Sequence, residues 1–97
     1  MGYDKHQLFA KMCDLLYSME VELGISQLPY AQKRILQVAA GCTDKSKNFN
    51  SVEVQTLCAE RYLMSRATYF RALTALKKSD WVRDVRGPES GTYRLNL

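Results

Sequence analysis

The chain has 97 residues, of which 46% are hydrophobic and 25% are charged, and its formal net charge at pH 7 is +4. This length suffices for one domain with one hydrophobic core, and it excludes a catalytic domain joined to a separate binding domain. The composition is typical of a folded globular protein. No run of about 18 apolar residues and no basic segment followed by an apolar one is present, so we expect a cytoplasmic protein with no membrane contact.

The basic residues are concentrated in the last third of the chain. Residues 1–60 carry a net charge of −1, whereas residues 61–97 carry a net charge of +5. Such an asymmetry favours a polyanionic partner such as nucleic acid. The alternative is a solvated basic surface that has no partner.

The cysteines argue against a disulfide framework and against a metal site. Cys13, Cys42 and Cys58 are odd in number and form no C-x-x-C pair, and the only histidine, His6, lies near the start of the chain. The sequence therefore predicts no metal and no cofactor. We interpret Cys13 and Cys58 as small hydrophobic residues among apolar neighbours, and we expect Cys42 in a loop.

A long amphipathic helix is predicted from Asp4 to Leu23, because apolar residues recur there at helical spacing and Gly24 follows as a typical helix end. Its apolar face is wider than one neighbour normally covers. We therefore expect this helix to serve both the core and a second subunit, in a homodimer. The alternative is that it only completes its own core. The predicted dimer interface consists of Leu8, Met12, Leu15 and Met19.

A second helix is predicted to open at Pro29, whose fixed φ suits the first helical position, and to run to Gly41. The segment CTDKSKNFN (residues 42–50) is polar and rich in turn formers, so we expect a loop anchored only by Phe49. A third helix should follow over about residues 52–61, with Asn50 or Ser51 as its N-cap.

The fourth predicted helix begins after an N-cap at Ser65. Its inward face follows the i, i+3, i+4, i+7 spacing and consists of Tyr69, Ala72, Leu73 and Leu76. The opposite stripe mixes small, aromatic, hydroxyl and basic side chains, namely Ala67, Phe70, Arg71, Thr74 and Lys78. That stripe is expected to face solvent or a ligand.

The chain is predicted to end in a β-hairpin, since two extended segments, residues 81–86 and 92–97, flank a turn rich in glycine and proline. In the second segment apolar and polar residues alternate, so one face should pack and the other should be polar. The expected fold class is thus mainly α with a small β-hairpin, with four helices followed by a two-stranded wing.

No catalytic constellation is present in the sequence. It contains no G-x-S-x-G motif, no phosphate-binding glycine loop and no H-E-x-x-H motif, so we expect no enzyme activity.

The segment CAERYLMSRATYFRALTALKKSDWVRDVRGPESGTYRLNL (residues 58–97) resembles a pattern of bacterial winged helix-turn-helix regulators, L-A-E-R-L-G-V-S-R-S-T-V-x-R-x-L-x-x-L-x-x-x-G-L-V. This group includes MarR-like proteins and replication proteins of phages and plasmids. Leu63 stands where the pattern has glycine, so the turn either takes another form or holds a left-handed non-glycine residue at some cost. The Gly-Leu pair before the wing is replaced by Asp80 and Trp81.

The sequence predicts one domain, residues 1–97, in which the wide apolar face of the N-terminal helix, residues 1–24, makes it the candidate for dimerisation. The resemblance implies that residues 52–78 form the helix-turn-helix and residues 81–97 the wing, and it implies roles for individual residues. Ser65 would cap the recognition helix and touch a phosphate. The side chains presented to the major groove would be Arg66, Ala67, Thr68, Phe70, Arg71 and Thr74, where arginine can pair with guanine and apolar groups can meet a thymine methyl.

The remaining cations have weaker assignments. Lys77 and Lys78 either contact phosphates or stabilise the helix dipole. Arg83, Arg86 and Arg94 would contact the DNA backbone or the minor groove from the wing, with Arg86 the first choice. Solvated surface charge is the alternative for Arg66 and Arg71, and a protein interface is the alternative for Phe70.

The function implied by the resemblance is sequence-specific binding of double-stranded DNA by a small transcription regulator, with no small-molecule ligand. Two alternatives remain open. One is a replication or partition accessory protein of a plasmid or phage, and the other is a winged helix used for protein–protein interaction.

Overall fold

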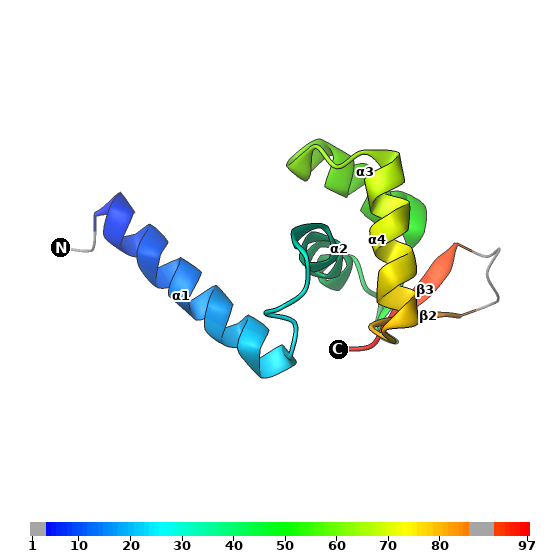
Figure 1. Ribbon diagram of the computed structural model, residues 1–97, viewed down its shortest axis with the longest axis horizontal. Coiled ribbons are helices and arrows are strands. Elements are labelled where there is room, and N and C mark those ends of the chain that lie inside the picture. The colour runs from blue at the N-terminus through cyan, green and yellow to red at the C-terminus, as the bar shows by residue number, and fades with distance from the viewer. Residues whose placement is uncertain (1–3, 86–90) are drawn as a thin grey trace.

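The computed structural model describes residues 4–85 and 91–97, and within them four helices and three short strands follow one another along the chain (Figure 1). The elements are α1 (Lys5–Leu23), α2 (Tyr30–Gly41), β1 (Asn48–Asn50), α3 (Ser51–Tyr62), α4 (Arg66–Lys78), β2 (Val82–Asp84) and β3 (Thr92–Leu95). The predicted class, mainly helical with a small β part, is confirmed.

Local capping residues fix the helix ends. The side chains of Asp4, Asn50 and Ser65 each accept a hydrogen bond from a backbone N–H in the first turn of α1, α3 and α4. Gly24 ends α1 in the left-handed conformation, with φ 80°, which glycine adopts without strain. Pro29 precedes α2 rather than lying in its first turn.

The three strands form one antiparallel sheet in the order β1-β3-β2. The prediction that residues 42–50 are only a loop is therefore wrong at its end, because Asn48–Asn50 pairs with β3 and places Phe49 opposite Tyr93. The predicted two-stranded wing is accordingly part of a three-stranded sheet. Phe49 is buried, as predicted.

One core lies between α2, α3, α4 and the inner face of the sheet. Its largest fully buried side chains are Tyr69, Ile35, Leu36, Leu76, Val54, Val82 and Cys58. The interpretation of Cys58 as a small core residue is confirmed, whereas Cys13 is exposed on α1 and the same interpretation is wrong there. We call this compact part, residues 25–85 and 91–97, the body.

Helix α1 extends away from the body (Figure 1), which gives the molecule extents of 52 × 26 × 25 Å. It contributes no buried residue. The expectation that α1 helps to form the core of its own chain is therefore wrong, because Gly24 turns the chain so that only the end of the helix lies near α2. There an ion pair joins Glu20 to Lys33 at 3.1 Å. None of the helices within residues 4–85 and 91–97 is long and apolar enough to cross a membrane.

Candidate nucleic-acid interface

Helix α4 has one buried face and one exposed face. Its buried residues are Tyr69, Ala72, Leu73 and Leu76, so the helical phase expected from the sequence is confirmed. Those side chains fix the helix against α2, α3 and β2. The opposite side is therefore held rigidly at the surface, where it can meet a partner without rearranging the core.

The turn that leads into α4 is tight. Leu63 ends α3 in the left-handed region, with φ 53° and ψ 33°, and its N–H bonds to the carbonyl of Ala59 at 3.1 Å. Leu63 is 90% exposed, whereas the next residue, Met64, is buried and anchors the turn. The sequence left open whether this turn takes another form or holds a left-handed non-glycine residue. The structure has the left-handed residue, Leu63.

Hydroxyl groups organise the first turn of α4. The Ser65 hydroxyl accepts the N–H of Thr68 at 3.1 Å and donates its proton to the Thr68 hydroxyl at 2.9 Å. The Thr68 hydroxyl then keeps a proton to donate. Because the first N–H groups of a helix have no partner within it, this end of α4 suits an anion such as a phosphate.

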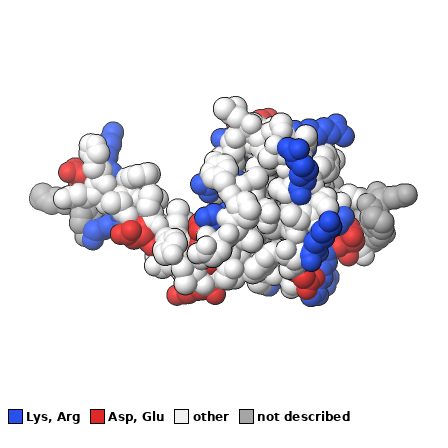
Figure 2. All heavy atoms as spheres, in the orientation of Figure 1, with Lys and Arg blue, Asp and Glu red and all other residues white. Residues whose placement is uncertain are grey.

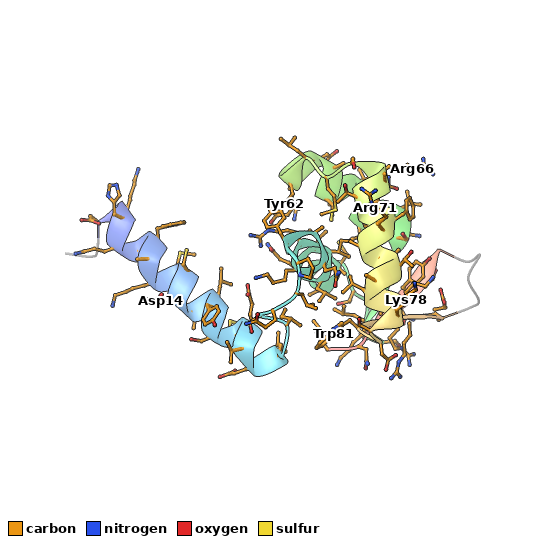
Figure 3. The ribbon with its side chains drawn as sticks, viewed as in Figure 1. Asp14, Tyr62, Arg66, Arg71, Lys78 and Trp81 are labelled. Carbon is orange, nitrogen blue, oxygen red and sulfur yellow. The ribbon has the colours of Figure 1, made fainter. Side chains whose placement is uncertain are left out.

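The charge of α4 has one sign, since its thirteen residues include no acidic side chain and four basic ones, Arg66, Arg71, Lys77 and Lys78. Lys77 lies 3.5 Å from the carboxylate of Asp84 on β2 and is largely neutralised. Arg71 and Lys78 have no ion pair or hydrogen bond within the part of the chain that the structure describes. Figure 3 labels Arg66, Arg71 and Lys78 along the helix, and Figure 2 shows Lys and Arg gathered on this side of the body.

Apolar groups lie between these cations. Phe70 is 40% exposed, and its ring packs edge-on against Tyr69 at 5.1 Å between centroids. The guanidinium of Arg66 lies 5.5 Å from the Phe70 ring centroid. The Thr74 hydroxyl donates to the carbonyl of Phe70 at 2.8 Å, so its proton is already in use. Phe70 is thus partly covered by its own helix.

The two described arginines of the predicted wing lie elsewhere. Arg83 and Arg94 are paired across β2 and β3, and both are exposed on the sheet face that points away from the core. The Nε and Nη2 atoms of Arg83 donate to the two oxygens of the Asp80 carboxylate, at 2.8 and 2.7 Å. This hydrogen bond lowers the pKa of Asp80 and raises that of Arg83. Arg94 donates to Asn48 at 3.4 Å.

The structure therefore brings together the predicted residues of α4 and its cap, but it places Arg83 and Arg94 on a separate surface. Arg86 lies outside the described residues. The sequence reasoning missed the neutralisation of Arg83 by Asp80, although opposite charges three residues apart were a visible signal. Within residues 4–85 and 91–97, no group of three or more His, Cys, Asp or Glu side chains is arranged to hold a metal ion.

Comparison with known proteins assigns no family, because no family model, curated protein or solved structure matches the chain. The resemblance of residues 58–97 to winged-helix regulators therefore depends on the motif alone.

Proposed function

We propose that the protein is a winged helix-turn-helix protein that binds double-stranded DNA in a sequence-specific manner, with α4 as the recognition helix and transcription regulation as its role. The observation that carries the proposal is the exposed face of α4, where Arg66, Arg71 and Lys78 have no acidic partner among the described residues. A rigid helix with one free face and one sign of charge fits the major groove of B-DNA.

The backbone before and after α4 agrees with this assignment. The resemblance has glycine at two positions, and here they are held by Leu63 and Asp80. Both residues have positive φ, 53° and 65°, which is the conformation that glycine adopts readily. The chain thus keeps the turn shape although it lacks the usual residue.

The contacts expected at the interface follow from the geometry. Thr68 and the first N–H groups of α4 would hold a phosphate, while Arg71 would reach base edges and Ala67 or Phe70 would meet a thymine methyl. The expected phosphate role of Arg83 is weakened, because its guanidinium is already paired with Asp80.

In the alternative of a protein-interaction module, the Phe70 ring, which is 40% exposed, would meet another protein instead of a thymine methyl. A replication or partition role would use the same DNA interface. Mapping the bound sites on genomic DNA separates the two roles, since a regulator occupies single sites at promoters and an initiator occupies clustered repeats.

The test is selection of bound duplexes from a random pool, followed by titration of the enriched duplex at several salt concentrations. We expect one enriched motif and an affinity that falls linearly with the logarithm of salt concentration. A pool that shows no enrichment, together with binding that does not depend on salt, would overturn the proposal.

A further inference from the structure

Helix α1 is the one helix of the described chain that buries none of its side chains. Nine large apolar side chains on it are exposed, and six of them form a stripe along one face: Leu8, Met12, Leu15, Leu16, Met19 and Leu23. An isolated helix of this length is marginal in water, and an apolar stripe of this extent normally meets a partner. Something must therefore cover the stripe.

The stripe is continuous, because these six residues fall within a sector of about 100° when successive residues are placed 100° apart. Its C-terminal part faces the body. There Leu16, Met19 and Leu23 line a groove of about 490 Å³ whose opposite wall includes Leu36 and Ala40 of α2. Figure 1 shows the N-terminal part of α1 extending away from the other described elements, and none of its residues lines this groove. Each copy thus has an open groove and a separate uncovered apolar segment.

The charges on α1 show which occupant fits. Residues 5–13 contain two lysines and no acidic residue, whereas residues 15–23 contain Glu20 and Glu22 and no basic residue. Lys11 and Glu22 border the same edge of the stripe and lie about 16 Å apart along the helix. In an antiparallel pair related by a two-fold axis, equal edges meet, so Lys11 of one copy comes level with Glu22 of the other, twice. In a parallel pair related by a two-fold axis, opposite edges of the stripe meet instead, so Lys11 of one copy and Glu22 of the other would lie on different sides of the interface and could not pair.

We propose that α1 pairs antiparallel with α1 of a second copy of this chain, so that the N-terminal half of each helix fills the groove between α1 and α2 of the other. Leu8 and Met12 then lie against the C-terminal stripe and α2 of the second copy. A single two-fold operation covers both stripes and closes the assembly. This inference does not rest on DNA binding, and it is tested without DNA.

The experiment is sedimentation equilibrium of the full chain across the micromolar range, and the expected species has twice the mass of the 11.1 kDa chain. Glu22→Lys and Lys11→Glu should each weaken the dimer by about tenfold, because each turns two attractions into two repulsions. The double variant, which exchanges the charges, should return the dissociation constant to near that of the parent.

The matched control is Asp14→Lys, which makes the same change of charge as Glu22→Lys on the opposite side of α1 and should leave dimerisation unchanged. The three substituted positions are exposed, and no residue of α1 is buried, so circular dichroism should report an intact body in all four variants. A chain that stays monomeric throughout overturns the proposal. So does a double variant as weak as the single ones, because the charges would then not meet.

Discussion

At Leu63 the chain holds a bulky side chain in the left-handed region, and that side chain is 90% exposed. The backbone strain is therefore not offset by packing. We expect Leu63→Gly to raise the free energy of unfolding by up to about 1 kcal/mol, since the relief of strain exceeds the added entropy of the unfolded chain. Urea denaturation measures this. In the control Ala59→Gly, within α3, the same measurement should show a loss of about 1 kcal/mol. If both variants lose stability alike, Leu63 makes a contact that we have not recognised.

Arg71 is the residue at which the proposed recognition of DNA bases can be tested separately from folding. Its side chain is exposed and has no partner among the described residues, so Arg71→Ala should leave the unfolding free energy nearly unchanged. Affinity for the selected duplex should fall by roughly 1–3 kcal/mol, with selectivity relaxed at one base position. Fluorescence anisotropy with matched and mismatched duplexes measures both effects.

Leu73→Ala is the contrast, because Leu73 is buried on the other side of the same helix. Its loss should cost about 2–5 kcal/mol of stability and should weaken binding only through unfolding. If Arg71→Ala bound every duplex as tightly as the parent does, recognition would have to come from another surface.

Among the elements, α4 is tied to the start of α3 by a buried hydroxyl pair. The Tyr69 hydroxyl donates to the backbone carbonyl of Ser51 at 3.1 Å and lies 3.0 Å from the Ser51 hydroxyl. We expect Tyr69→Phe to lower the unfolding free energy by about 1–3 kcal/mol, because the buried Ser51 hydroxyl loses its partner and the Ser51 carbonyl loses one of its hydrogen bonds. The same substitution at the exposed Tyr17 on α1 should have no measurable effect in the same denaturation experiment.

The same pair predicts a late ionisation. Burial raises the pKa of Tyr69 from 10.0 to about 12, so the folded state holds this proton more tightly than the unfolded state does. The stabilisation is complete below pH 10 and is lost as the pH rises toward 12. Spectrophotometric titration should show one tyrosine that ionises later than the others, and Tyr69→Phe should remove that component. A titration curve that Tyr69→Phe leaves unchanged would contradict the assignment.

The elements also show what a sequence can reveal. The helices, the cap at Ser65 and the outward stripe of α4 were predictable, because capping and helical spacing are local properties. Strand β1 could not be predicted, because three residues are too few to show an alternation of apolar and polar side chains. The strand exists only through its pairing with β3. The separation of Arg83 from the α4 surface was hidden for the same reason, since it depends on which face of the sheet covers the core.

For the whole molecule, the independence of the body can be measured. Because α1 buries nothing, removal of residues 1–24 should change the unfolding free energy at low protein concentration by no more than the Glu20–Lys33 ion pair contributes, about 0–1 kcal/mol. Leu36→Ala in the full chain is the comparison, with an expected loss of about 2–5 kcal/mol. A shortened chain that fails to unfold cooperatively would show that α1 is needed for folding.

The turn at Gly24 also separates helix α1 from the body that carries α4. Residues before it can change without touching the side chains that pack the body, and the exposed face of α4 can change without touching α1. Choice of partner and choice of DNA sequence would then be free to diverge independently among descendants of this gene. A new pairing specificity could begin with substitutions within residues 5–23, none of which is buried in the body.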